Sequence, residues 1–132
     1  MAQVAKFSAV SLDCKDPVAL ARFYADMTGW PIADEANLGS NPEWVELAAP
    51  SGPVIAFQRA EGYEPPVWPS DDKPQQAHLD FDVPDLDVGE RSILALGARK
   101  AETQPGTSFR VYLDPAGHPF CLVLNTDVRL DD

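Results

Sequence analysis

The sequence contains no apolar run near the roughly 20 residues that a membrane-spanning helix needs. It has only two cysteines, Cys14 and Cys121, which are too few for a disulfide scaffold. The first ten residues show no apolar stretch and no cleavage pattern of a signal peptide. From these absences we expect a cytoplasmic protein whose two thiols stay reduced.

Positive charge is also scarce, because 10 basic residues stand against 21 acidic ones and leave a formal net charge of −11. A surface this acidic repels phosphate backbones and anionic lipids, so we expect neither nucleic acid nor membrane as a partner. The 132 residues are enough for one domain, and 45% hydrophobic with 23% charged residues is typical of a globular fold.

An internal repeat organises the chain. Residues 9–16 and 78–85 both alternate in character and both end in aspartate. Each is followed by a helix-like stretch that ends at a glycine, and then by a Pro-x-Gly turn before an apolar run. These later features are Gly29 with residues 50–52, and Gly97 with residues 115–117. The pattern predicts two modules of similar layout.

Two helices are predicted, one in each module. Asp16 is a suitable N-cap and Pro17 suits the first helical position, while Gly29 is the expected C-terminal stop. Apolar residues between them recur at helical spacing, at positions 20, 23, 24 and 27. The second helix is expected from Asp85 to Gly97, with an internal glycine at position 89 that costs about 1 kcal/mol relative to alanine.

Runs rich in Val, Ile, Phe and Trp between turn residues predict the strands. They are residues 5–14, 31–35, 43–49, 53–59, 76–83, 99–103, 108–114 and 118–125. The predicted fold is α+β, with two tandem βαβββ modules that form a curved mixed sheet around a cup and helices outside. The expected boundaries are module 1 at about 1–60, a proline-rich connector at 61–75, module 2 at about 76–125 and a polar, frayed tail at 126–132.

The predicted strands carry different side chains on their two faces, because successive residues of a strand alternate. One face is aliphatic or aromatic and packs beneath the helices. The other face is polar or small. A sealed core face would be aliphatic, because each unpaired buried polar group costs about 1–3 kcal/mol. We therefore interpret the polar face as the lining of a ligand pocket. It contains Ala9, Ser11, Asp13, Ala56, Gln58, His78, Asp80, Asp82, Cys121 and Val123.

His78 is the main candidate for chemistry, because imidazole exchanges protons near neutral pH and suits general base catalysis. Asp80 lies two residues later on the same face and would orient it. A structural histidine bonded to a carboxylate is the competing interpretation. Cys121 is more typical of a small buried hydrophobic residue than of a nucleophile.

Several other residues are candidate ligand contacts. Arg110 would clamp a carboxylate or phosphate, unless it pairs with a surface acid. Tyr63 and Trp68 lie in the proline-rich connector, which is expected to be extended, and they either dock on the body or border the site. The full set of expected ligand contacts is Ser11, Gln58, Tyr63, Trp68, Gln76, Arg110 and Cys121.

The repeat and its motifs resemble the vicinal oxygen chelate superfamily, which includes glyoxalase I, extradiol dioxygenases, fosfomycin-resistance enzymes and bleomycin-binding proteins. The matching segments are VSLDCKDP at 10–17, HLDFDV at 78–83 and DPAGHPFC at 114–121. Residues 74–80 resemble a branch described as glyoxalase-like, whose members generally have no assigned substrate. The resemblance implies paired βαβββ modules around a cup and a frequent homodimer.

In metal-using members of this superfamily, four ligands come from the first and last strands of each module. The matching positions are Ala9, Ala56, His78 and Cys121. Only the histidine is a normal ligand there, and hard cations need more carboxylates than these positions offer. We therefore expect no catalytic metal. A displaced site would combine His78 with Cys121, Gln58 or Asp80.

The sequence thus favours a small-molecule-binding protein of the glyoxalase/bleomycin-resistance type, with an organic ligand in the cup between its modules and no cofactor. One alternative is a lyase or isomerase that uses His78 as a general base. Another is a metal-dependent glyoxalase or dioxygenase with a displaced site. A third is an interaction domain that has lost its pocket, since a fold does not fix a function.

Overall fold

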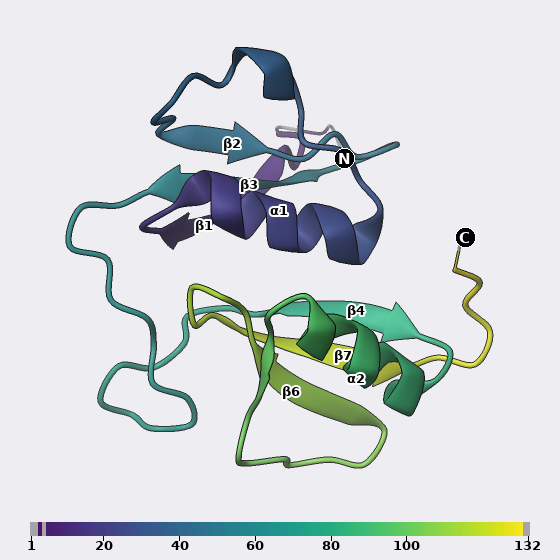
Figure 1. Cartoon of the computed structure of the whole chain (residues 1–132). Coiled ribbons are helices and arrows are strands. Elements are labelled where there is room, and N and C mark those ends of the chain that lie inside the picture. Colours follow the sequence, from purple (N-terminus) through teal and green to yellow (C-terminus); the bar gives the residue numbers. More distant parts are fainter. Residues whose placement is uncertain (1–2, 4, 131–132) are drawn as a thin grey trace. The chain divides into compact units, whose positions relative to one another are not determined.

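The computed structural model describes residues 3 and 5–130, which form two compact units that divide between Tyr63 and Glu64 (Figure 1). Residues 1, 2 and 4, and the last two residues of the predicted tail, lie outside the described residues. Among the described residues, no helix combines the length and the apolar composition that crossing a membrane would require.

The first unit contains one long helix and one mixed sheet. In chain order its elements are β1 (Ala9–Cys14), α1 (Pro17–Thr28), the 3-10 helix η1 (Glu35–Asn37), β2 (Trp44–Glu46) and β3 (Val54–Arg59). The strand order is β1-β3-β2, with β1 parallel and β2 antiparallel to the central β3.

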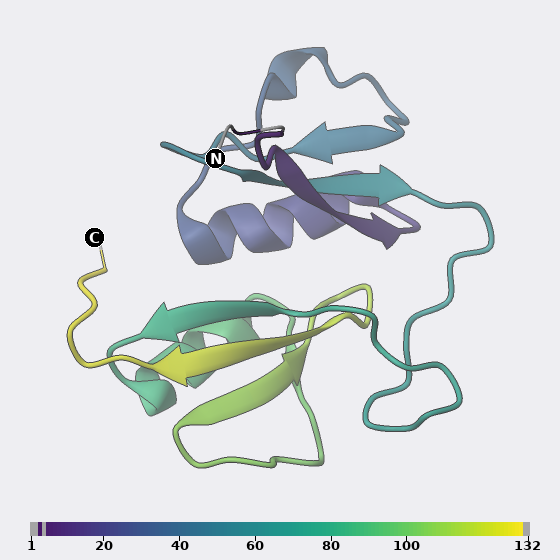
Figure 2. The same cartoon turned by 180° about the vertical axis from the view of Figure 1, so that it is seen from behind.

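The second unit repeats this plan with one strand more. Its elements are β4 (Leu79–Val83), α2 (Leu86–Ala95), β5 (Arg99–Lys100), β6 (Phe109–Leu113) and β7 (Pro119–Leu124). The strand order is β4-β7-β6-β5, with β4 parallel to β7 and the other neighbours antiparallel. Figure 2 shows β4 and β7 side by side. The prediction of an α+β fold built from two βαβββ-like modules is confirmed.

The predicted strand at 31–35 is wrong. Only one isolated bridge, between Ile32 and Leu47, forms there. Asp34 then adopts a left-handed conformation with φ of 51°, and η1 follows at once. A left-handed residue turns the chain away from extended geometry, so the first module has three strands in its sheet.

Both predicted helices are confirmed, together with their caps. The side chain of Asp16 accepts a hydrogen bond from the Ala19 N–H at 3.1 Å, and Asp85 caps α2 in the same way through Val88 at 3.0 Å. Gly29 has φ of 77° and donates its N–H to the Ala25 carbonyl at 2.9 Å, which ends α1. Only a residue tolerant of positive φ fits this position.

Aromatic side chains pack between α1 and its sheet in the first unit, and in the second unit they pack against one another within the sheet. In the first unit the rings of Tyr24 and Phe57 stack with centroids 5.6 Å apart. In the second, Phe120 lies between Phe81 and Tyr112, at 6.1 and 5.8 Å. A Cβ at Gly89 would come within 3.1 Å of Leu122, so the glycine that weakens α2 lets it approach the sheet closely.

The proline-rich connector is not an extended run, which corrects the prediction. It folds back on itself, because the Val67 N–H donates to the Lys73 carbonyl at 2.7 Å and the Lys73 ammonium pairs with Glu64 at 2.6 Å. It also docks on the second unit, where a Cβ at Gly117 would lie only 2.6 Å from Pro65. A proline ring fixes the φ angle of its own residue, but the residues between the prolines can still close a loop through their own hydrogen bonds and ion pairs.

Candidate functional site

The first and last strands of each module pair in parallel, with the same register in both units. Ser11 lies opposite Ala56 in the first unit, and Asp80 lies opposite Cys121 in the second. Paired residues point to the same side of a sheet. The polar residues predicted to share a face therefore do so within each unit, and the aliphatic residues between them face the helix. The predicted cup between the modules stays a prediction.

The second unit gathers three candidate residues into one cluster, which we call the His78 cluster: His78, Asp80 and Cys121. His78 stands directly before β4, and its Nε2 lies 3.2 Å from Oδ1 of Asp80. One ligand-type atom from each residue lies within 4.8 Å of the other two. The His78 and Asp80 side chains are 42% and 57% exposed, whereas Cys121 is only 6% exposed. The cluster thus presents an imidazole and a carboxylate to solvent above a buried thiol.

The Cys121 thiol is held in its protonated form. Three effects together raise the pKa of Cys121 to about 11. The largest is burial, and the others are the charge of the Asp80 carboxylate and its hydrogen bond with the thiol. The thiolate is the nucleophilic species, so a thiol with this pKa is a poor nucleophile at neutral pH. The expectation that Cys121 acts mainly as a small buried residue agrees with this environment.

The first unit presents a different set of polar groups on the equivalent face. Ser11 and Gln58 are exposed there, as the alternation predicts for this face. Trp44 lies opposite Gln58 and is 45% exposed, and its indole N–H donates to Glu46 at 3.0 Å. Trp44 is not among the ligand contacts that the sequence analysis predicts. The alternation of Trp44 and Glu46 with the buried Val45 is the signal that would have placed it on the open face.

The connector candidates lie outside these strands. Tyr63 and Trp68 are both half-buried, and Gln76 is exposed three residues before β4. Their roles as ligand contacts stay predictions.

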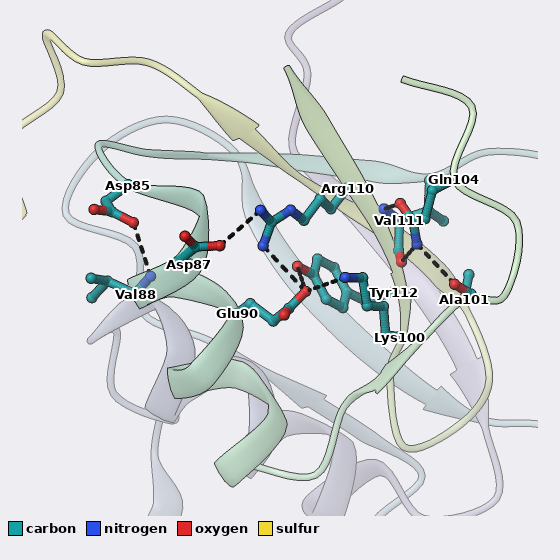
Figure 3. A network of polar contacts seen from close by, with 10 residues as sticks. All are labelled: Asp85, Asp87, Val88, Glu90, Lys100, Ala101, Gln104, Arg110, Val111 and Tyr112. Atoms are coloured by element: carbon teal, nitrogen blue, oxygen red, sulfur yellow. Dashed lines mark hydrogen bonds and ion pairs between the residues drawn. The ribbon is translucent and has the colours of Figure 1, made fainter. Parts of the chain in front are cut away.

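Arg110 lies on the other face of the second sheet. It is paired with Leu122 in the β6–β7 register, so it shares the face that α2 covers. Figure 3 shows its guanidinium directed at two acidic residues of α2. Its Nη2 lies 2.8 Å from Asp87 and its Nη1 lies 3.4 Å from Glu90. Arg110 therefore pairs with acidic side chains, which was the alternative to a ligand clamp in the sequence analysis. Its role in binding a ligand stays a prediction.

Glu90 is the centre of this polar network, which ties α2 to β5 and β6 (Figure 3). Its Oε1 accepts a hydrogen bond from the Tyr112 hydroxyl at 2.9 Å and pairs with the Lys100 ammonium at 2.9 Å. The hydrogen bond from Lys100 lowers the pKa of Glu90, and the hydrogen bond from Arg110 lowers the pKa of Asp87. Burial and the adjacent Glu90 carboxylate raise the pKa of Tyr112 well above its usual value.

The donor atoms present do not fit the hard divalent cation that the fold family implies. In the first unit the equivalent strand positions hold Ala9, Ser11 and Ala56, none of which is a carboxylate or imidazole. Among the described residues of the second unit, the His78 cluster brings together one imidazole, one carboxylate and one sulfur atom. Mg²⁺ and Mn²⁺ prefer several oxygen ligands, whereas this set offers one carboxylate beside a nitrogen and a soft sulfur atom. No step is therefore assigned to such a metal.

The Glu90 network makes the second unit sensitive to acid. A carboxyl whose pKa is lowered on folding stabilises the fold above its unfolded value of 4.5 and loses that contribution as the pH falls through the folded value. We expect Glu90→Gln to lower the free energy of unfolding by about 1 kcal/mol at about pH 7. The deficit relative to wild type should be smaller at about pH 3, because the native carboxyl loses its charge as the pH falls through its lowered folded pKa.

Urea unfolding at both pH values measures this difference. Glu102→Gln is the matched control, because Glu102 is exposed and outside the network. An equal deficit for Glu90→Gln at both pH values would contradict the electrostatic explanation.

The Asp80 carboxylate should control the reactivity of Cys121. We expect Asp80→Asn to lower the pKa of the thiol, because a negative charge and an acceptor of the thiol proton are both removed. At about pH 8 the alkylation of Cys121 by iodoacetamide should accelerate severalfold, with burial limiting the gain. Peptide mass spectrometry separates Cys121 from Cys14, and Asp82→Asn on the same strand is the control. Equal rates in wild type and Asp80→Asn would rule out this effect.

Comparison with known proteins adds family membership to this geometry. The model of a family described as a glyoxalase-like domain matches residues 9–123. None of the curated proteins compared matches the sequence significantly.

Solved structures share the fold at low sequence identity. A glyoxalase/bleomycin resistance protein/dioxygenase family enzyme from Burkholderia phytofirmans PsJN is 23% identical, with a TM-score of 0.67 over 89% of this chain and 97% of that chain. A glyoxalase-related enzyme from Fulvimarina pelagi is 19% identical, with a TM-score of 0.63 over 98% and 99%. A fosfomycin resistance protein from Mesorhizobium loti is 14% identical, with a TM-score of 0.65 over 95% of each chain. With the family match over residues 9–123, the chain belongs to the glyoxalase-like domain family, and its doubled module has the same fold as these glyoxalase/bleomycin resistance/dioxygenase proteins.

Proposed function

We propose that the protein binds a small organic molecule, aromatic or amphipathic, on the polar sheet face that carries the His78 cluster, without a catalytic metal. The observation that carries the proposal is the exposed pair of His78 and Asp80, 3.2 Å apart, above a buried thiol. Polar groups that are oriented by each other and still open to solvent are suited to fix a ligand. Sequestration of this kind needs shape and a few polar contacts, but no reaction.

Two further observations support binding. The equivalent face of the first unit carries the exposed indole of Trp44 beside the amide of Gln58, a combination that suits the flat, partly polar surface of an aromatic ligand. Similar proteins are named for resistance to bleomycin and to fosfomycin, which are small organic molecules. The predicted location in a cup between the modules and the predicted homodimer are parts of the same proposal.

Ligand binding should raise the thermal stability of the protein and should depend on His78. We expect bleomycin, or a member of a panel of aromatic carboxylates and cationic antibiotics, to raise Tm, since a ligand at 100 times its Kd adds about 2.7 kcal/mol. His78→Ala should lose this shift, measured against its own unliganded Tm. His118→Ala, which changes the second histidine of the chain, should keep it.

Native mass spectrometry and elemental analysis of the purified protein complete this test, because they report retained ligand, metal and subunit count together. Stoichiometric zinc on the protein would replace the proposal with a metal-dependent function, since imidazole, carboxylate and thiolate are zinc ligands. A panel that shifts no Tm, or one that shifts His78→Ala as much as wild type, would overturn it.

A general base at His78 is the second candidate, favoured by one distance. The contact between His78 Nε2 and Asp80 Oδ1 fixes the ring and leaves Nδ1 for a substrate proton. The reaction class would be proton abstraction next to a carbonyl, as in a lyase or isomerase.

This candidate predicts that the protein exchanges a C–H proton of its ligand with solvent. In D₂O, NMR of a carbonyl-bearing ligand found by the Tm panel should show exchange that slows about 10²–10⁴-fold in His78→Ala. The Kd should change far less, because a base acts mainly in the transition state. Asp82→Asn is the control on the same face. Parallel losses of exchange and affinity, or no exchange in wild type, would rule out a base.

A further inference from the structure

A groove in the first unit is separate from the His78 cluster. Its volume is about 680 Å³, within the range of small-molecule sites. It lies where β1 ends and α1 begins, beside the loop at 39–42. Its lining residues are Lys15, Asp16, Val18, Ala19, Arg22, Gly39, Ser40, Asn41, Pro42 and Arg59.

The groove concentrates positive charge in an acidic protein. Residues 1–63 contain four basic residues, Lys6, Lys15, Arg22 and Arg59, and the last three line this groove. Asp16 is the acidic residue in the lining. The local balance is therefore positive, whereas the chain as a whole has a net charge of −11. A groove lined by one sign of charge concentrates ligands of the other sign.

The three cations are positioned differently. Among the described residues, the exposed ammonium of Lys15 makes no hydrogen bond or ion pair. Arg22 pairs with Glu35 of η1, which does not line the groove, and both side chains are about half exposed. An ion pair this exposed is weak, so it leaves Arg22 available to a second anion.

Arg59 anchors the wall of the groove. Its guanidinium donates to the Pro42 carbonyl, which holds the 39–42 loop against the end of β3. A guanidinium has five N–H donors, so this bond leaves others for a ligand. Asp16 is occupied as the cap of α1 through the Ala19 N–H at 3.1 Å. An anion in the groove would therefore be held by the basic side chains, and not by the helix end.

We propose that this groove binds a small organic anion, through a carboxylate or phosphate group held by Lys15, Arg22 and Arg59. Arginine forks match the geometry of both groups, and lysine adds a mobile charge. The proposal is independent of the ligand at the His78 cluster, because no residue of that cluster lines the groove.

Three probes with the same carbon skeleton test the proposal: glycerol 3-phosphate, glycerate and uncharged glycerol. Each is titrated into ¹⁵N-labelled full-length protein, and the amide shifts of residues 15–22, 39–41 and 59 are followed. At least one anion should shift these amides with a Kd of about 1 mM or below, and glycerol should not. The anion that binds more tightly identifies the preferred group.

Charge-neutralising variants decide whether the groove is responsible. Lys15→Gln should weaken binding about tenfold, and Arg59→Gln should do the same if its loop stays folded. Lys6→Gln is the matched control, because it removes the one basic residue of 1–63 outside the groove and should leave the Kd nearly unchanged. Lys15 is exposed, so its variant is expected to fold.

The proposal is overturned if neither anion shifts the groove amides at about 10 mM, or if Lys6→Gln weakens binding as much as Lys15→Gln. The second result would show general charge attraction without a site. Both outcomes leave the Tm shifts that test the His78 cluster unaffected.

Discussion

The parallel pairing of first and last strands is the constraint on which the candidate site depends. It brings Asp80 beside Cys121, 41 positions apart in the chain, and brings Ser11 beside Ala56 with the same register. Because paired residues share a face, the pairing divides each sheet into a side that packs under a helix and a side that carries polar groups. A slip of one residue would exchange the two sides and bury the carboxylates.

Two uses of charge distinguish the two faces of the second sheet. On the helix-covered face, Glu90 accepts a hydrogen bond from Tyr112 and pairs with Lys100 and Arg110. Its charge is thereby compensated, and these contacts hold α2 on the sheet. On the other face, His78 and Asp80 contact each other and remain open to solvent. Charged side chains that are fully engaged stabilise a fold, whereas an oriented but accessible pair is available to a ligand. The same module thus carries an internal network and a candidate binding surface.

Much of the fold could be predicted because local chemistry determines it. Asp16 and Asp85 cap their helices as expected, Gly29 ends the first helix, and the alternation in both modules places polar and apolar residues on opposite faces. Local signals failed where the chain makes contacts at longer range. Residues 31–35 have the composition of a strand, but the left-handed Asp34 limits them to one bridge, and Val67 and Lys73 close a connector whose prolines predicted an extended chain.

The sequence by itself determined the doubled module, the family and the polar character of one sheet face, because caps, turns and alternation act between residues close in the chain. Only the tertiary structure decided which partner each side chain meets. It turned Arg110 toward Asp87 and Glu90, placed Trp44 opposite Gln58, buried the Cys121 thiol beside Asp80, and gathered Lys15 and Arg59 around one groove. These contacts depend on strand register and helix packing, which join residues tens of positions apart and leave no pattern in the local sequence.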